Sequence, residues 1–129
     1  MDRRPLGVGI INLAYFLAKR GLKYDDDSIQ TIDEYAEAWS YYLIKASVEL
    51  AKERGQCIRS SDTKYHQGLF PKDTYKKEVD ELIKPKERMR WKSLKKDVME
   101  HGIRNSTLMA LMPAETSAQI SNSTNGIEP

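Results

Sequence analysis

Hydrophobic positions recur at three- and four-residue spacing through the middle of the chain, which is the period of an amphipathic helix. A Thr31–Glu34 pair has the spacing of a capping box, and Gly55 provides a stop. The apolar stripe between them consists of Tyr35, Ala38, Trp39, Tyr42, Leu43, Ala46 and Leu50. We therefore predict a long helix over residues 31–54.

Two shorter stretches have the same period. The sequence WKSLKKDVMEH, residues 91–101, is amphipathic and stops at Gly102. Between the long helix and this one the signals are broken, and Pro71 interrupts them. The stretch KDTYKKEVDELI nevertheless predicts a short amphipathic helix over 74–83.

The most apolar stretch is LGVGIINLAYFLA, which begins at Leu6. It is apolar on nearly every side, as is typical of a helix enclosed by neighbours. We expect a buried helix over 6–20 that ends at Gly21. Its apolar run is shorter than the roughly 20 residues that span a bilayer, so no membrane segment is expected.

The period changes near the end of the chain. Residues 107–112, TLMALM, form a short and nearly continuous apolar run, which is the pattern of a parallel strand buried on both faces. No convincing second strand is found elsewhere in the sequence. A lone buried strand would leave its backbone groups unpaired, so we expect a mostly helical piece of a larger α/β structure whose other strands lie outside this chain.

A turn follows the predicted strand directly. Pro113 ends the apolar run, and Thr116 with Gln119 has the spacing of a capping box, so a helix is expected to start near 116. The free N–H groups of a helix N-terminus can hold a phosphate without Lys or Arg, and the hydroxyls of Thr116 and Ser117 would add donors. The alternative is an ordinary capped helix, in which Glu115 only complements the helix dipole.

Composition narrows the class of protein. The 129 residues suffice for one domain or a piece of one. Lys and Arg number 21 and Asp and Glu 19, mixed along the chain, which argues against a nucleic-acid binder. The single cysteine, Cys57, cannot form an internal disulfide. A reducing, cytoplasmic setting is expected.

Other candidate residues have simpler interpretations. The GVG stretch, residues 7–9, lacks the third glycine of a dinucleotide fingerprint and is better explained by close helix packing. His66 and His101 lack partners at metal-ligand spacing. Tyr41 and Tyr42 are expected to pack on the core and flank of their helix. Cys57 has no evident base beside it and is interpreted as a bystander thiol.

Several stretches together resemble the large, catalytic subunit of class I ribonucleotide reductase, of the bacterial or phage type. They are RRPLGVGIINLAYFLAKRGLKY, YYLIKASVELAKERG, DTYKK and above all HGIRNSTLMALMPAETSAQISNSTNGIEP. The similarity runs in order from about Arg3 to the last residue. The final motif is the most specific part.

The resemblance implies a ten-stranded α/β barrel, of which residues 1–129 would be one part. It also implies reduction of ribonucleoside diphosphates to deoxyribonucleoside diphosphates by thiyl-radical chemistry, for DNA synthesis. The segment that matches Pro113, Ala114, Glu115, Thr116 and Ser117 cradles the substrate diphosphate in this family. Pattern and resemblance therefore indicate the same turn.

Cofactors and partners follow from the resemblance alone. The complete enzyme takes its radical from a metal-containing small subunit and its electrons from a thioredoxin or glutaredoxin, and it responds to ATP and deoxynucleotide effectors. This chain is expected to bind none of these cofactors itself, to work with the remaining pieces of the large subunit, and to contact neither membrane nor nucleic acid.

Departures from the family pattern limit what can be transferred. Many relatives have serine at Ala114 and Ala118, so two hydroxyls are missing here. The radical cysteine, the redox cysteine pair and the allosteric sites match nothing in the chain, and Cys57 lies outside those motifs. We expect a piece of a split, interrupted or truncated reductase, inactive alone and broken off at Pro129. The alternative is a stand-alone helical interaction module without catalytic activity.

Overall fold

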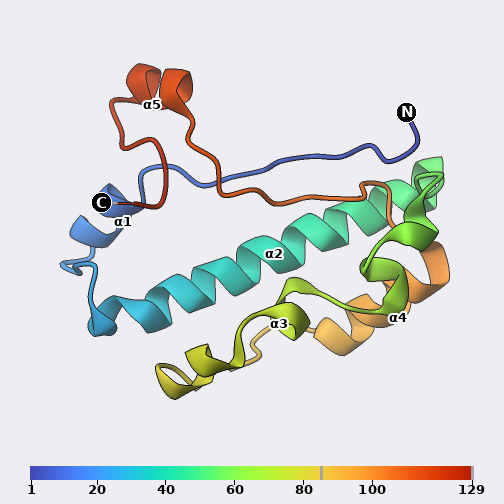
Figure 1. Cartoon of the computed structure of the whole chain (residues 1–129), viewed down its shortest axis with the longest axis horizontal. Helices are drawn as coiled ribbons and strands as arrows, with labels where there is room; N and C mark the ends of the chain where they lie inside the picture. Colours follow the sequence, from blue (N-terminus) through green and yellow to red (C-terminus); the bar gives the residue numbers. More distant parts are fainter. Residues whose placement is uncertain (85, 129) are drawn as a thin grey trace.

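The computed structural model describes residues 1–84 and 86–128, so Pro85 and Pro129 lie outside the described residues. The helices are α1 (Leu13–Ala18), α2 (Asp26–Arg54), α3 (Pro71–Thr74), α4 (Trp91–His101) and α5 (Glu115–Ser121), with short 3-10 turns at Ser60–Asp62, Tyr65–Gln67 and Lys77–Glu81. Figure 1 shows α2 along most of the molecule's length, with two extended segments on one side of it and α3 and α4 on the other. In the described part of the chain, no helix is both long and apolar enough to cross a membrane.

Helix α2 confirms the predicted long helix but begins five residues earlier, at Asp26 rather than 31. Asp26 and Asp27 occupy its first turn, where negative charge complements the helix dipole. The predicted Thr31–Glu34 capping box is wrong, because both positions lie inside the helix. The end at Gly55 is confirmed: Gly55 has a φ of 80°, and its N–H donates to the carbonyl of Ala51, 2.8 Å away.

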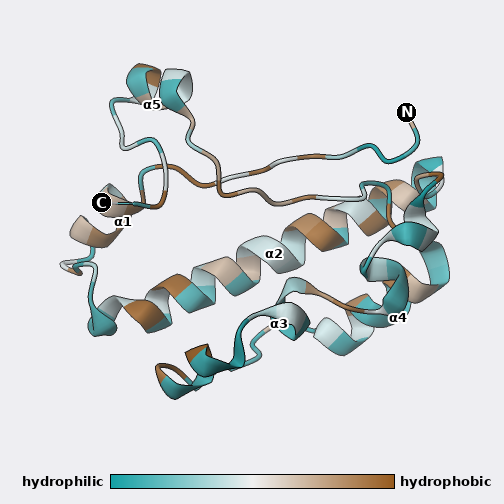
Figure 2. Ribbon diagram, viewed as in Figure 1, coloured by the Kyte–Doolittle hydropathy of each residue, from teal (hydrophilic) through white to brown (hydrophobic). Residues whose placement is uncertain are grey.

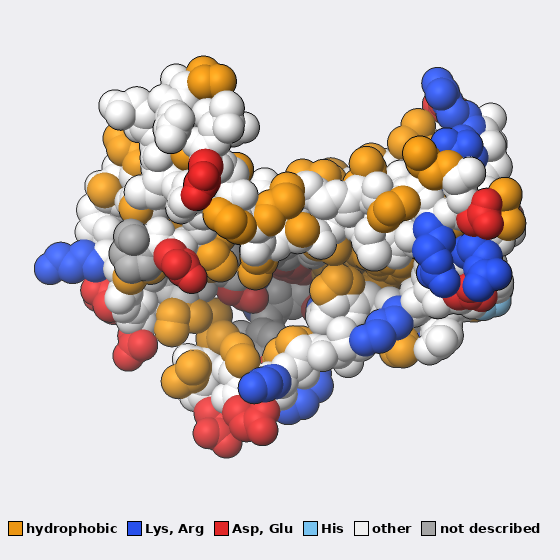
Figure 3. All heavy atoms as spheres, turned by 45° about the horizontal axis from the view of Figure 1, so that its top comes forward, with side chains coloured by type: hydrophobic (Ala, Val, Ile, Leu, Met, Phe, Trp, Pro, Cys, Tyr) orange, Lys and Arg blue, Asp and Glu red, His pale blue; other side chains and the backbone are white. Residues whose placement is uncertain are grey.

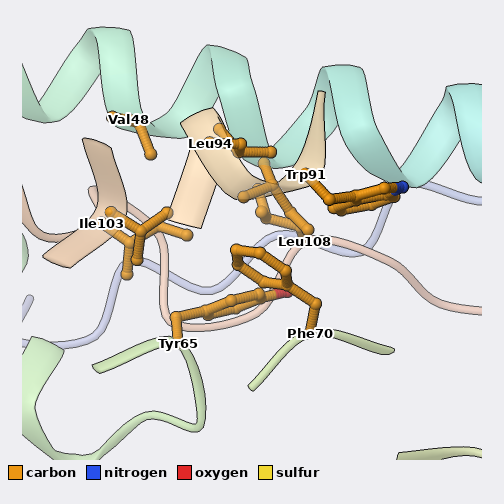
Figure 4. Packing of buried hydrophobic residues seen from close by; sticks show 9 residues of the cluster. Val48, Tyr65, Phe70, Trp91, Leu94, Ile103 and Leu108 are labelled. Atoms are coloured by element: carbon orange, nitrogen blue, oxygen red, sulfur yellow. The ribbon is translucent and has the colours of Figure 1, made fainter. Parts of the chain in front are cut away.

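Helix α4 confirms the prediction for residues 91–101, and Gly102 follows it with a φ of 71°. It packs against α2 and contributes to a cluster of buried apolar side chains, which are Ile44, Val48, Tyr65, Phe70, Trp91, Leu94, Val98, Ile103 and Leu108. Figure 4 shows these side chains converging from α2, α4 and the loops on either side. Burial of each large apolar side chain contributes about 1.5–3 kcal/mol, so this cluster fixes how the elements sit together.

The predicted helix over 6–20 is wrong in its first half. Residues 5–10 are extended, and helix forms only from Leu13 to Ala18. A parallel bridge joins Val8 to Met109, about a hundred residues away in sequence. Gly9 explains the close approach, because a Cβ there would lie 2.7 Å from the carbonyl oxygen of Ala110. The glycines thus allow close packing, as expected, but against an extended segment rather than a helix.

The predicted strand over 107–112 is extended but is not a regular strand in the described residues, where an isolated bridge is the only pairing assigned. Its partner lies in this chain, contrary to the expectation that all sheet partners lie elsewhere. Four backbone hydrogen bonds join the two segments: Ser106 N–H to Arg3 O (2.9 Å), Leu6 N–H to Thr107 O (3.0 Å), Val8 N–H to Leu108 O (2.9 Å) and Ala110 N–H to Val8 O (3.0 Å). We call residues 3–10 and 105–112 the extended pair.

Burial on both faces of this predicted strand is not seen in the chain by itself. Leu108 is buried, but the side chains of Leu111 and Met112 are 69% and 44% exposed. Figure 2 shows that much of the extended pair is hydrophobic. In Figure 3, apolar side chains gather along the middle of the face that comes forward, with charged side chains mainly towards its ends.

The predicted helix over 74–83 is also wrong. Helix α3 ends at Thr74, Tyr75 is extended with a ψ of 167°, and a 3-10 turn follows at Lys77–Glu81. Pro71 starts the helix early because its ring already has the helical φ, and the Asp73 carboxylate accepts the N–H of Phe70 at 2.9 Å. The residues of the amphipathic pattern therefore belong to two short elements, α3 and the 3-10 turn at Lys77–Glu81, rather than to one helix.

Glu37 of α2 joins this helix to the start of α4. Its Oε1 accepts the indole N–H of Trp91 (2.9 Å) and the backbone N–H groups of Arg88 (2.8 Å) and Met89 (3.2 Å), while Oε2 lies 3.2 Å from the Arg88 guanidinium. The Glu37 side chain is 11% exposed. Burial alone raises the pKa of this carboxyl, but the hydrogen bonds from Trp91, Arg88 and Met89 outweigh burial and lower the pKa below its ordinary value.

Candidate functional site

The five predicted site residues form one exposed turn between the extended pair and α5. Pro113 is exposed, Ala114 is the residue before the helix, and Glu115, Thr116 and Ser117 form the first turn of α5. The predicted helix start at 116 is confirmed to within one residue. The Thr116–Gln119 capping box is wrong, since both residues lie inside α5 and the cap makes no side-chain hydrogen bond.

The turn presents unused hydrogen-bond donors. Among the described residues, the backbone N–H groups of Glu115, Thr116 and Ser117 have no protein acceptor, and neither do the hydroxyls of Thr116 and Ser117. The N–H of Ala114 is different, because it donates to the carbonyl of Asn125 at 2.9 Å. Three amides and two hydroxyls therefore face solvent at the positive end of α5, an arrangement suited to an anion.

No basic side chain assists these donors. Residues 105–129 contain neither Lys nor Arg, and Glu115 adds a negative charge at the first position of the helix. Any anion held here would depend on backbone N–H groups and hydroxyls rather than on an ion pair. The carboxylate of Glu115 makes no ion pair within the described residues.

The chain after α5 folds back and fixes the turn. Asn122 ends the helix in the left-handed region with a φ of 49°. The carbonyl of Thr124 then accepts the N–H of Asn12 (3.1 Å), and the carbonyl of Ile127 accepts the Tyr24 hydroxyl (3.0 Å). These two contacts tie residues 124–127 to the first part of the chain. The bond from Ala114 to Asn125 ties the same segment to the turn. Figure 1 shows this return beside α1.

A pocket of about 450 Å³ adjoins the turn. Its lining combines α5 with the returning segment and consists of Glu115, Ala118, Gln119, Asn122, Ser123 and Asn125. Sequence reasoning missed the last three of these residues. The signal that could have found them is the polar SNSTNG stretch, residues 121–126.

Two larger cavities lie elsewhere. They measure about 720 and 640 Å³ and are lined mainly by α2, residues 62–87 and residues 106–111. Among the described residues, none of those that line these two cavities belongs to the turn. We favour the turn because unused backbone N–H groups and two unused hydroxyls lie together in the exposed first turn of α5.

The remaining candidate residues lie apart from the turn. Cys57 is 2% exposed, and its N–H donates to the carbonyl of Ile103, so its thiol belongs to the core. Tyr41 packs edge-on against Trp91 with ring centroids 5.3 Å apart, whereas Tyr42 is 57% exposed, as expected for core and flank positions. These residues do not join a common site.

The two histidines also lie outside the turn. His66 is exposed in a 3-10 turn, and His101 is the last residue of α4. In residues 1–84 and 86–128, no group of three or more His, Cys, Asp or Glu side chains could hold a metal ion.

Known proteins resemble this chain over its whole length. The sequence model of a family described as "Ribonucleotide reductase, barrel domain" matches residues 1–129. The alpha subunit of ribonucleoside-diphosphate reductase from Haemophilus influenzae is 55% identical over 130 aligned residues, which cover 100% of this chain and 17% of the relative.

Other relatives show the same partial coverage. The alpha subunit of ribonucleoside-diphosphate reductase 1 from Escherichia coli is 52% identical, over 100% of this chain and 17% of the relative. The subunit from Enterobacteria phage T4 is 49% identical, over 98% of this chain and 17% of the relative. This chain thus spans about 17% of the length of these relatives. Because the family model matches every residue, the chain belongs to the ribonucleotide reductase barrel-domain family.

Proposed function

We propose that this chain is a working part of the large subunit of a ribonucleoside-diphosphate reductase and supplies the turn that binds the substrate diphosphate. The observation that carries the proposal is the group of unused donors at the start of α5, formed by the amides of Glu115, Thr116 and Ser117 and the hydroxyls of the last two. The names of the relatives, ribonucleoside-diphosphate reductase subunits, support the substrate class.

The geometry suits a diphosphate because several unused donors lie together in the exposed first turn of α5. Backbone N–H groups at a helix N-terminus point along the helix axis and can share the oxygens of one phosphate. The hydroxyls of Thr116 and Ser117 would reach further oxygens. Ala114, whose N–H is bonded to Asn125, would shape the turn rather than donate, and Pro113 would end the extended segment ahead of it.

The extended pair holds this turn on the core. Leu108 is buried in the cluster shared with α2 and α4, and the hydrogen bonds with residues 6–8 fix the direction of the segment that leads to Pro113. A turn at the end of an extended, anchored segment is where α/β folds place ligands. We propose that Leu111 and Met112, which are exposed here, pack against further barrel strands in the complete enzyme.

The reduction itself requires groups beyond this turn. Replacing the ribose 2′ hydroxyl by hydrogen releases water and needs two electrons, which a dithiol supplies on becoming a disulfide. The chain has one cysteine, Cys57, and it is buried in the core. We therefore propose that the thiols come from the rest of the large subunit and the radical from a small subunit, in the cytoplasm. The chain's own role involves no step through a metal.

Reconstitution tests this proposal. The chain should not reduce a ribonucleoside diphosphate alone, but should restore reduction when mixed with the remaining large-subunit segments, the small subunit and a dithiol reductant. A matched mixture without this chain should be inactive. Reduction by the chain alone would contradict the proposal, as would full activity of the mixture that lacks it.

A stand-alone interaction module predicts a different outcome. Such a module would bind a partner without restoring reduction in any mixture. The same experiment therefore separates the two functions, because only an enzyme segment changes the yield of deoxyribonucleotide.

A further inference from the structure

A buried polar cluster joins the extended pair to α2. It consists of Ser47, which is 1% exposed, Asn105, which is 7% exposed, and the backbone of Arg4. The Ser47 hydroxyl donates to Asn105 Oδ1 (2.8 Å) and accepts the backbone N–H of Asn105 (3.0 Å), and Asn105 Nδ2 donates to the Arg4 carbonyl (2.9 Å). Every polar atom of the Asn105 side chain is thus used.

Thr107 makes a second side-chain hydrogen bond between the two segments of the extended pair. The Thr107 hydroxyl donates to the Leu6 carbonyl at 3.2 Å. Asn105 and Thr107 are two residues apart on one segment, and they bond to carbonyls two residues apart, at Arg4 and Leu6, on the other. In one alignment of the two segments, both side chains therefore find an acceptor at the same time.

The backbone at Arg4 also receives contacts from the second segment. Arg4 has a φ of 45°, in the left-handed region that is unfavourable for a residue with a side chain. Ser106 N–H bonds to Arg3 O and Asn105 Nδ2 bonds to Arg4 O, so contacts on both sides of this φ come from residues 105 and 106.

The rest of the pair specifies its register weakly. The facing stretches are PLGVGII and TLMALM. The first includes two glycines, and Gly-rich segments are prone to slip. A slip by one residue would move the 113–117 turn by about 3.3 Å and would exchange inward and outward side chains. A displacement of about 1 Å can already lower catalytic rates a hundredfold.

We propose that Asn105 and Thr107 are positioning residues that set the register of the extended pair and so place the diphosphate-binding turn. This inference rests on the proposed function, because the register affects substrate binding only if the 113–117 turn binds the diphosphate. Neither side chain touches the substrate. They act through the 106–112 segment that they align.

The register can be measured directly in the full chain. A Cβ built on Gly7 lies 3.4 Å from the Cβ of Ala110, close to the separation found in disulfides. With Cys57→Ala as background, the pair Gly7→Cys and Ala110→Cys should form a disulfide readily in the native register. The pair Gly7→Cys and Leu111→Cys should form one only after a slip of one residue, which brings position 111 to the place of 110.

The register variants are Thr107→Val alone and Thr107→Val combined with Asn105→Ala. Thr107 is exposed, so its replacement does not threaten folding. The matched control is Thr63→Val, which removes a buried hydroxyl bond to Ser60 O (2.6 Å) outside the extended pair. We expect the single variant to lower the ratio of native to slipped disulfide about fivefold, the factor that one hydrogen bond contributes, and the control to leave the ratio unchanged.

Substrate kinetics of the assembled reductase supply the second measurement. The apparent KM is the intrinsic value divided by the aligned fraction, so Thr107→Val should raise KM for a ribonucleoside diphosphate only as far as the disulfide ratio shows that fraction to fall, with kcat within about twofold. Thr63→Val should change neither. Unchanged disulfide ratios in both register variants would overturn the inference.

Failure of the inference can be told apart from failure of the proposed function. If Thr116→Val raises KM but the disulfide ratio is unchanged in both register variants, the turn binds substrate and the register inference is wrong. If Thr116→Val leaves KM unchanged, the proposed function fails, and the disulfide ratio alone decides whether Asn105 and Thr107 set the register.

Discussion

Removing the charge of Glu37 should destabilise the chain by about 2 kcal/mol. In Glu37→Gln one oxygen can still accept the indole of Trp91, but the amide group faces the Arg88 guanidinium that Oε2 contacts in the native chain. Hydrogen bonds to charged groups contribute about 1.5–3 kcal/mol, against about 0.5–1.5 kcal/mol for neutral ones. Glu37→Gln loses the charge of the hydrogen bond to Arg88, whose side chain is 18% exposed. We therefore expect the free energy of unfolding to fall by about 2 kcal/mol.

Glu37→Ala should cost more, about 3–4 kcal/mol. Trp91 is 4% exposed, so its indole N–H would have no acceptor, and a buried unpaired donor costs about 1–3 kcal/mol. The backbone N–H groups of Arg88 and Met89 would also lose their hydrogen-bond acceptor, Glu37 Oε1. The matched control is Glu34→Gln, an exposed position on the same helix, which should change stability by less than about 0.5 kcal/mol.

Urea unfolding followed by tryptophan fluorescence measures these differences, and its pH dependence tests their cause. Because the folded pKa of Glu37 is lowered, its stabilisation is complete above the ordinary carboxyl value of 4.5 and is lost as the pH falls through the folded pKa. The gap between wild type and Glu37→Gln should therefore be constant near neutral pH and shrink below about 4.5. A gap that is absent at pH 7, or that grows on acidification, would refute this reasoning.

Two further predictions concern packing. Gly9→Ala should destabilise the chain by about 1–3 kcal/mol, because the new Cβ would lie 2.7 Å from the Ala110 carbonyl oxygen. Thermal unfolding measures this loss. An unchanged melting temperature would show that the two segments of the extended pair do not approach closely at Gly9. Ile103→Ala should cost about 2–5 kcal/mol because Ile103 is fully buried, whereas Ile58→Ala, at a side chain 76% exposed, should cost little in the same urea titration.

The sequence was informative where local signals agree with tertiary packing. Helix α4 has an amphipathic period and a glycine stop, and the structure begins and ends it at Trp91 and His101 as predicted. The turn before α5 was also located, because a proline followed by Glu115, Thr116 and Ser117 is a strong local signal for a helix start. Neither feature depends on a distant partner.

The extended pair could not be found in the same way. Residues 5–10 are apolar on nearly every side, which is equally compatible with a buried helix or a buried strand. The decision between them is made by residues 106–110, which supply the hydrogen bonds but lie about a hundred positions away. Two glycines among β-branched residues were the local hint of an extended segment.

The candidate site was predicted in outline but not in detail. Residues 113–117 were expected to form the turn, but the sequence did not indicate that the Asn125 carbonyl accepts the N–H of Ala114. That contact depends on a chain return through Asn122 in the left-handed conformation. A left-handed Asn is recognisable as a helix end, but the position to which the chain then returns is set by tertiary contacts.

Substrate affinity of the turn tests the central claim most directly. In the assembled reductase, Thr116→Val combined with Ser117→Ala should raise KM for a ribonucleoside diphosphate at least about tenfold, since hydrogen bonds to a charged group contribute about 1.5–3 kcal/mol each. Ser121→Ala is the control, because that hydroxyl donates back to Ser117 O (2.7 Å) within α5, and it should leave KM unchanged. An unchanged KM in the double variant, or an equal rise in the control, would contradict the assignment of this turn as the diphosphate site.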